Sequence, residues 1–288
     1  MSQRRFLFSK KKRAKSFNLP GNFLDSLRRF LADKRQRFVL SVLVLTAGLF
    51  FSENLLSKSG FFIVIALAAL TDLLLFVSVR KDMKENSVKV SGFAFILPFF
   101  YTLSFGLFYF LVPARFLTRL LVTLLYASGL YSLFLAENIF LIAASRTIAL
   151  LSGARIISFI LTIVSFFFLS DVFFSFDLPI IPTAILIFVS SFFLILHSIW
   201  STLIDQSFLT RINWTIILSV CLLELSLVLG FWPVSSTVIA IFLTGFFYII
   251  VGISQVWLDR RLFKGVIWEY IWVGTIAFCL LMLSTFIG

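Results

Sequence analysis

Six ionisable side chains lie inside long apolar stretches of the sequence, where a charge is costly to place. They are Asp72, Glu137, Asp171, His197, Glu224 and Glu269, and the amide Asn138 follows Glu137 directly. Insertion scales put the cost of such a group in the hydrocarbon of a bilayer at about 3 kcal/mol, which makes each a candidate functional position. A histidine beside a carboxylate can exchange protons with it, and a carboxylate can hold a cationic ligand.

Three of these residues share one depth if each apolar stretch forms a helix. Asp72, Glu137 and His197 lie equally far from the cytoplasmic end of their stretches, about 10 Å at the rise of an α-helix. One hypothesis is a polar, inward-facing cavity that contains these residues and Asn138. The alternative is that the polar groups pair across helices and lock the bundle together.

The other three ionisable residues fall at different depths. Glu224 is expected nearer the midplane, roughly 18 Å from the inner boundary, and is the fifth candidate of the polar layer. Asp171 and Glu269 stand near the ends of their stretches, so we expect both to reach the membrane interface.

Several classes of chemistry are excluded by what the sequence lacks. A single histidine cannot make a bis-histidine haem site, an HExxH metalloprotease or a zinc site of several histidines. No serine stands in a Gly-x-Ser-x-Gly setting, and Cys221 and Cys279 have no metal-ligand spacing. We therefore expect no catalytic residue, no metal site and no cofactor, and a membrane-embedded enzyme is only the second alternative.

The composition requires that lipid cover much of the folded chain. Of 288 residues, 60% are hydrophobic and 13% are charged, and the mean hydropathy is +1.07. A soluble domain is about a quarter charged, and no soluble fold hides so much apolar surface. We predict an all-α fold, a polytopic bundle of transmembrane helices, in which the 39 phenylalanines are lipid-facing bulk.

Apolar stretches of about twenty residues, the length that crosses a bilayer, recur between short polar or Pro/Gly breaks. Nine spans are predicted, at 38–56, 61–79, 93–112, 120–144, 156–176, 183–204, 212–231, 234–258 and 266–287. In the first, Arg37 and Glu53 leave only a short uncharged run between them. The connections are too short for a soluble domain, so residues 38–288 are predicted to form one bundle.

The distribution of lysine and arginine predicts which side each end occupies. With the N-terminus inside, all but three of the 25 Lys and Arg fall in cytoplasmic segments, the exceptions being Lys58, Arg115 and Arg119. The positive-inside rule then holds at every internal loop. We predict a cytoplasmic N-terminus and an external C-terminus, and attribute the net charge of +12 to topology rather than to nucleic-acid binding.

Residues 1–37 are predicted to form a basic cytoplasmic arm. A polybasic run at 10–15 precedes a Pro-Gly break, and residues 22–36 have apolar positions at helical spacing. Such an amphipathic helix is expected to lie on anionic lipid headgroups. The alternative is a contact of the basic run with RNA, the ribosome or a partner protein.

Two arginines flank the mostly apolar connection between the fourth and fifth predicted spans. Arg146 and Arg155 are expected to lie at the membrane surface, on a segment (145–155) that runs along it. There they would reach lipid phosphates, or act as counter-ions to carboxylates on neighbouring helices.

A distinctive run of residues extends from the fourth predicted span, through this connection, into the fifth. It comprises Glu137-Asn138-Ile139-Phe140, Ala143-Ala144, Arg146-Thr147-Ile148, Leu150-Leu151, Ala154-Arg155, Phe159, Leu161-Thr162 and Phe166-Phe167-Phe168. The run, within residues 133–176, resembles an uncharacterised family of polytopic membrane proteins from the small-genome candidate phyla (Patescibacteria). The resemblance implies a bacterial cytoplasmic membrane protein and carries over no catalytic residue.

Three functional classes follow from these observations. The first is a structural or accessory membrane component that docks a protein partner. The second is a secondary transporter or lipid-handling protein that uses the polar layer, and the third is an enzyme. We favour the first, because Pro98 and Pro182 stand in the first turns of their helices and no span has the paired interruptions of discontinuous transporter helices.

Overall fold

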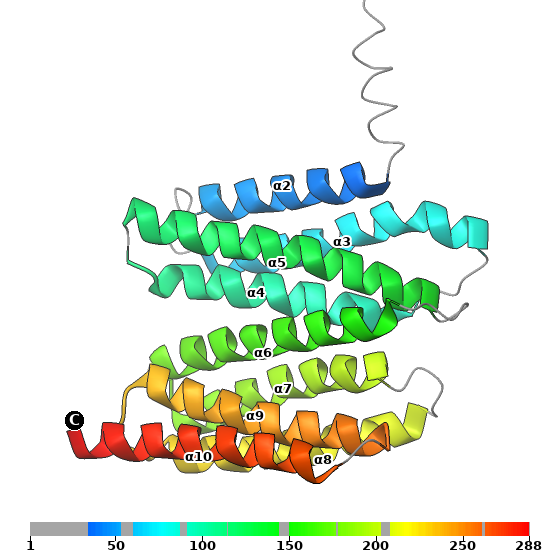
Figure 1. Cartoon of the computed structure of the whole chain (residues 1–288). Helices are drawn as coiled ribbons and strands as arrows, with labels where there is room; N and C mark the ends of the chain where they lie inside the picture. The colour runs from blue at the N-terminus through cyan, green and yellow to red at the C-terminus, as the bar shows by residue number, and fades with distance from the viewer. Residues whose placement is uncertain are drawn as a thin grey trace, which may run out of the picture. The chain divides into compact units, whose positions relative to one another are not determined.

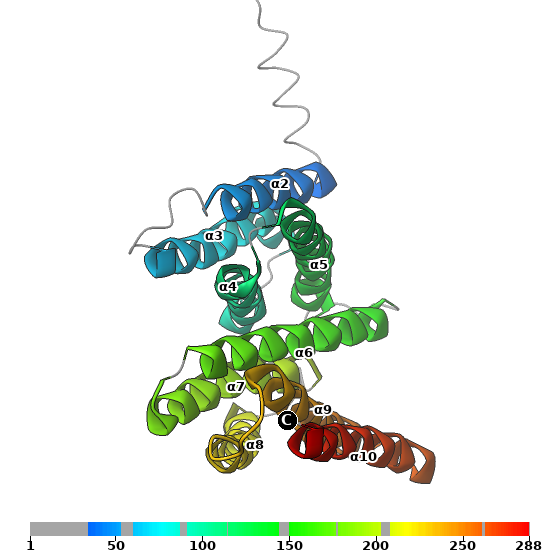
Figure 2. The ribbon, with the colours of Figure 1, turned by 90° about the vertical axis from the view of Figure 1, so that its left-hand side faces the viewer.

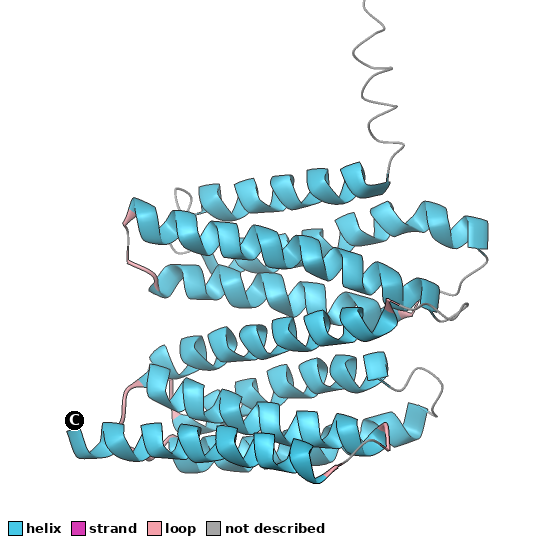
Figure 3. Ribbon diagram, in the orientation of Figure 1, coloured by secondary structure: helices cyan, strands magenta, loops and turns pink. Residues whose placement is uncertain are grey.

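The computed structural model describes residues 34–52, 60–86, 91–113, 115–143, 150–176, 178–202, 208–260 and 263–287. Within these ranges the chain forms nine α-helices and one short 3-10 helix, with no strand (Figure 3). The chain divides into two compact units, residues 1–37 and 38–288. Most of the predicted basic arm, including almost all of the predicted helix at 22–36, lies outside the described residues.

The helices follow one another with short connections. Their bounds are α2 Lys34–Ser52, α3 Gly60–Asn86, η2 Gly92–Phe95, α4 Ile96–Leu111, α5 Phe116–Ala143, α6 Leu151–Ser175, α7 Ile180–Thr202, α8 Phe208–Leu229, α9 Ser236–Leu258 and α10 Lys264–Ile287. A helix satisfies its backbone hydrogen bonds within itself, which hydrocarbon surroundings demand. Pro98 and Pro182 both occupy first turns, where no intrahelical N–H partner is lost. The all-α membrane fold predicted from the sequence is confirmed.

Eight of the described helices, α3 to α10, are long and apolar enough to cross a membrane. They coincide with eight of the nine predicted spans. The remaining prediction, 38–56, corresponds to α2, which is helical but is not among the eight. Its first turn contains Lys34, Arg35 and Arg37, so its uncharged part is shorter than the roughly 20 residues that a bilayer requires.

Helix α6 lies at the centre of the second unit. It packs against α4, α5, α7 and α9, while α8 packs on α7 and α9, and α10 packs on α9 (Figures 1 and 2). Helix α2 contacts its neighbours through side chains: Phe38 packs on Phe134 of α5, and the hydroxyl oxygens of Ser41 and Ser78 of α3 lie 3.5 Å apart.

Consecutive helices alternate in direction. The C-terminal ends of α3, α5, α7 and α9 lie at one end of the bundle with the N-terminal ends of α4, α6, α8 and α10 (Figure 1). The predicted cytoplasmic positions Arg155 and Lys264 therefore belong to the same end of the bundle.

Phenylalanine fills much of the interior as well as the surface. The rings of Phe166 and Phe247 stack with centroids 4.4 Å apart and join α6 to α9, and Phe168 stacks on Phe108 of α4 at 4.2 Å. Aromatic pairs contribute about 0.5–1.5 kcal/mol beyond the area that they bury. The interpretation of phenylalanine as lipid-facing bulk fits exposed rings such as Phe61 and Phe62, but not the buried Phe166 and Phe247, because hydropathy does not distinguish a core position from a lipid-facing one.

Candidate functional site

Glu137 and His197, two of the three residues predicted to share one depth, are in direct contact. Glu137 lies on α5 and His197 on α7, and His197 Nε2 is 2.8 Å from Glu137 Oε1. Both side chains are fully buried. A hydrogen bond of this length between two inaccessible polar groups fixes α5 against α7 at that point.

The surroundings of this pair are aromatic. The imidazole of His197 lies near the rings of Phe140 and Trp200, with centroid distances of 6.4 and 5.7 Å. Within the described part of the chain, Glu137 Oε2 and His197 Nδ1 have no hydrogen-bond partner. The pair is therefore enclosed by apolar side chains, and each member has one hydrogen-bonding atom that no described protein group satisfies.

Asp72 and Asn138 lie beside the pair without bonding to it. Asp72, half-buried on α3, interacts electrostatically with Glu137. In the described structure, neither Asp72 Oδ1 nor Asn138 Oδ1 has a hydrogen-bond partner. The predicted polar layer is thus one bonded pair with a second carboxylate near it, and its assignment as a functional site stays a prediction.

The last two turns of α7 are joined to two further helices through backbone carbonyl groups. From α6, Arg155 Nε and Nη2 donate to the carbonyl oxygens of Ser201 and Thr202 at 3.0 and 3.1 Å. From α9, Gln255 Nε2 donates to the carbonyl oxygen of Ser198 at 3.2 Å and to its hydroxyl at 2.6 Å.

Arg155 also faces an acidic residue that follows α9. Its Nη1 lies 3.9 Å from Asp259 Oδ2, and both side chains are 30% exposed. The carbonyl groups at the end of a helix have no intrahelical partner and carry partial negative charge, so a guanidinium group there is favourable. Arg155 therefore lies within ion-pair distance of one carboxylate and also bonds the carbonyls of α7; its predicted role as a counter-ion or lipid-phosphate ligand stays a prediction.

We call these residues the α7 C-terminal network: Glu137, Arg155, His197, Ser198, Ser201, Thr202, Gln255 and Asp259. Through it, the last two turns of α7 are tied to α5, α6 and α9. Hydrophobic burial gives helices little reason to associate in lipid, so such polar contacts and close packing hold them together.

The remaining candidates are not part of this network. Glu224 is exposed on the surface of α8, and Arg146 lies outside the described residues. Asp171 is only 6% exposed because helix packing covers it, and it lies close to the end of α6; its place at the membrane interface stays a prediction. Arg155 lies in the second turn of α6, so this part of segment 145–155 is helical rather than a surface connection.

Five members of the network were missed from the sequence: Ser198, Ser201, Thr202, Gln255 and Asp259. Ser201 and Thr202 take part through their backbone carbonyl groups, which no side-chain pattern reveals. Gln255, Ser198 and Asp259 carry no cost that hydropathy detects, because serine and glutamine are uncharged and Asp259 follows the end of its span. A weaker signal was present: Gln255 and Asp259 are four residues apart at the end of a span, directly before two arginines in the sequence.

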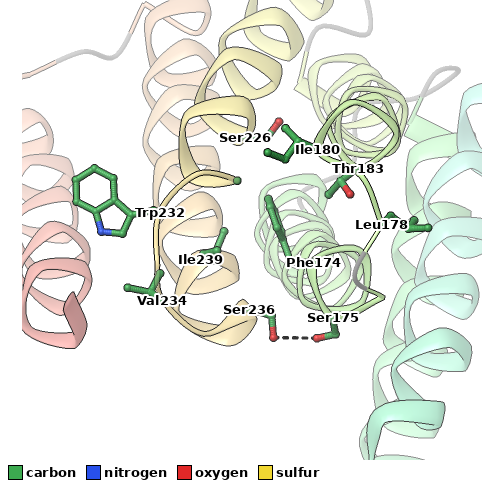
Figure 4. A pocket seen from close by; sticks show the side chains of 11 residues that line it. Phe174, Ser175, Leu178, Ile180, Thr183, Ser226, Trp232, Val234, Ser236 and Ile239 are labelled. Atoms are coloured by element: carbon green, nitrogen blue, oxygen red, sulfur yellow. Dashed lines mark hydrogen bonds between the residues drawn. The ribbon is translucent and has the colours of Figure 1, made fainter. Parts of the chain in front are cut away.

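Figure 4 shows a separate pocket of about 590 Å³. By the helix bounds, it lies at the opposite end of the bundle from the network. It is lined by residues at or beside the C-terminal ends of α6 and α8 and the N-terminal ends of α7 and α9. Its described lining mixes apolar side chains such as Phe174 and Ile239 with the hydroxyls of Thr183 and Ser226, and no charged side chain is among these described residues. Ser175 donates a hydrogen bond to Ser236 at its edge, at 2.9 Å.

The fold and these contacts define an all-helical, multi-pass membrane protein whose interior is joined by a few polar groups. The chain belongs to the family described as "Protein of unknown function (DUF5656)", which matches residues 39–284. No curated protein and no solved structure matches the chain significantly.

Proposed function

We propose that the protein is a structural or accessory component of a bacterial cytoplasmic membrane, with its N-terminus inside and its C-terminus outside. The bundle serves as a rigid anchor, and the basic arm of residues 1–37 faces the cytoplasm, where it meets anionic lipid headgroups and a protein partner. The topology and the anchoring role have separate support.

The topology is supported by the basic residues at the two ends of the bundle. Arg80, Arg155, Arg211, Arg260 and Lys264 all belong to the end formed by the C-termini of α3, α5, α7 and α9. In the sequence, the connections at the opposite end have only Lys58, Arg115 and Arg119 in or beside them. The positive-inside rule places the first end in the cytoplasm whether or not α2 crosses the membrane.

For the basic arm to lie in the cytoplasm as well, α2 must also cross the membrane. Twelve of the 25 Lys and Arg precede residue 38. If α2 did not span, this arm would lie on the external side with the N-terminal end of α3. A short span with charged flanks is accommodated by local thinning of the bilayer and by long basic side chains that reach the interface.

One observation carries the anchoring role: the ionisable pair at the predicted functional depth is used for helix packing. Glu137 and His197 are bonded to each other at 2.8 Å and fully buried. A transport pathway would need solvent or substrate to reach these groups, whereas a fixed bundle needs them paired. The direct bond between Glu137 and His197 favours a fixed bundle.

The experiment compares variants in a host strain that lacks its own copy of the gene, at matched membrane abundance. An accessory role predicts that deletion of residues 1–20 reproduces the gene-deletion phenotype, whereas Glu137→Gln and Asp72→Asn do not. As a control, residues 1–20 are exchanged for an unrelated segment of equal charge. Normal growth of this variant would mean that the arm only sets the orientation of the protein in the membrane. A transporter would give the reverse result, with loss of function in Glu137→Gln and none on deletion of the arm.

A second candidate, lipid handling, is favoured by the pocket. By the proposed topology it opens near the external boundary, and its mixed lining of apolar groups and hydroxyls suits one acyl chain and an uncharged polar head. Its volume lies within the range of pockets for small ligands.

This candidate is tested by native mass spectrometry of the detergent-extracted protein. Lipid handling predicts one retained lipid in the wild type, lost in Val234→Trp, which fills the pocket. Ile241→Trp, on the exposed surface of α9, is the matched control and retains it. A wild type that carries no lipid contradicts the candidate.

A further inference from the structure

Two buried hydroxyl groups of the pocket in Figure 4 have used their own protons and can still accept hydrogen bonds. Thr183 Oγ1 donates to the carbonyl oxygen of Pro179 at 3.2 Å, and Ser226 Oγ donates to that of Leu223 at 2.7 Å. The two side chains are only 4% and 2% exposed. A hydroxyl oxygen has two acceptor lone pairs besides its proton. A ligand that matches these two groups must therefore bring hydrogen-bond donors of its own.

A third hydroxyl of the pocket can act as a donor. Ser236 Oγ accepts a hydrogen bond from Ser175 at 2.9 Å and retains its own proton, with which it can donate. In the view of Figure 4 this serine pair lies on the other side of the Phe174 ring from Thr183 and Ser226. The pocket thus offers acceptors on one side and a donor on the other, which suits a ligand with several hydroxyl groups.

The electrostatics of the pocket favour an uncharged ligand. The N-terminal ends of α7 and α9 carry partial positive charge, and the C-terminal ends of α6 and α8 carry partial negative charge. The segments that contribute the described lining, 174–183 and 226–239, contain no Lys or Arg. Their one acidic residue, Asp177, lies outside the described residues. An anionic phosphate group would therefore find no counter-ion in these segments.

The remaining side chains of the described lining are mostly apolar. They include Leu178, Val234 and Ile239, beside the ring of Phe174. Such a lining can cover the apolar face of a sugar ring and the first carbons of an acyl chain, while a few polar groups orient the ligand. Ile181 and Phe231, which are sequence neighbours of lining residues, are exposed, as suits contact with acyl chains.

We infer that the pocket binds the uncharged head group of a glycolipid, whose sugar hydroxyls donate to Thr183 and Ser226 and accept from Ser236. A lipid is favoured over a soluble sugar because the pocket lies at the ends of membrane spans and has apolar side chains exposed beside it. The inference rests on the lipid-handling candidate and names its substrate class. It is independent of the anchoring role.

The test is native mass spectrometry of the full-length protein after its own lipids have been removed. The protein is mixed with equal amounts of monogalactosyl diacylglycerol, phosphatidylglycerol and phosphatidylethanolamine, all with the same acyl chains. We expect the galactolipid to be bound in preference to either phospholipid by about tenfold, which corresponds to one or two hydrogen bonds. Val234→Trp, which fills the pocket, should abolish this preference.

Two threonine-to-valine variants separate the pocket hydroxyl from a general effect of the substitution. Thr183→Val removes one acceptor and should lower the preference for the galactolipid about 3- to 10-fold. Thr275→Val is the matched control, because Thr275 also bonds the carbonyl group four residues earlier but is exposed on α10. The control should keep the wild-type preference. The preference is a ratio of lipids bound to the same protein, so a loss of folded protein does not change it.

The outcomes distinguish this inference from the candidate on which it rests. Equal binding of the three lipids, or an equal fall in preference in both valine variants, overturns the head-group assignment and leaves lipid handling standing. Binding of none of the lipids contradicts lipid handling itself. Displacement of the galactolipid by an equal concentration of methyl galactoside would identify the ligand as a soluble sugar and overturn its assignment to a lipid.

Discussion

At the scale of single residues, the buried pair of Glu137 and His197 places two ionisable side chains out of reach of solvent. Each partner lowers the cost of burying the other, as their 2.8 Å contact at zero exposure shows. Removal of one partner leaves a buried polar group alone, whereas removal of both leaves an apolar contact. The two kinds of variant should therefore differ.

The pair predicts a strongly non-additive double-mutant cycle. Glu137→Leu and His197→Leu should each lower the free energy of unfolding by about 2–4 kcal/mol, and the double variant should lose at least about 1 kcal/mol less than their sum. Reversible unfolding of the detergent-solubilised protein in sodium dodecyl sulfate measures this coupling. Additive losses would mean that the two residues do not stabilise each other.

Arg155 predicts a residue-specific effect of a different kind. Arg155→Ala removes two charge-assisted bonds to the carbonyl groups that end α7, so unfolding should become easier by about 1–3 kcal/mol. Arg155→Lys keeps the charge but loses the planar geometry of the guanidinium group, so it should retain only part of this stabilisation. Arg115→Ala, at an exposed position, is the control; an equal loss there would contradict a specific contact in the same unfolding assay.

At the scale of elements, close approach of helices depends on glycine at a few crossings. A Cβ at Gly129 of α5 would clash with the hydroxyl of Tyr101 on α4, which donates to the carbonyl oxygens of Leu125 and Tyr126. Small residues at such crossings let helices pack tightly in lipid, where packing is a main source of stability.

Two glycine-to-alanine changes, one at this crossing and one away from it, should have opposite effects on thermal stability. Gly129→Ala should displace Tyr101 and lower the melting temperature, by an amount equivalent to about 1–3 kcal/mol. Gly153→Ala, in α6 with open space around the new methyl group, should be neutral or stabilising, because alanine is the better helix former. Thermal unfolding of both variants checks the pair, and destabilisation by Gly153→Ala alone would contradict the packing described.

At the scale of the whole molecule, hydropathy and charge predicted most of the fold but less of the site. Eight predicted spans coincide with helices, because a span needs only length and apolarity. Depth along a helix could also be read, which put Glu137 and His197 at one level. Which face of a helix points inward could not be predicted, because lipid and protein interior are equally apolar. Glu224, for example, was grouped with the buried residues but lies on the surface. The carbonyl partners of Arg155 depend on tertiary placement alone.

The central claim is that the protein crosses the membrane with its ends on opposite sides, which requires α2 to span in addition to the eight helices α3 to α10. The most direct measurement is the location of both termini in intact cells, with fusions of a green fluorescent protein and of a phosphatase active only outside the cytoplasm. We expect fluorescence from the N-terminal fusion and phosphatase activity from the fusion after Gly288. Both termini on the same side would contradict it, because eight spans return the chain to the side from which it started.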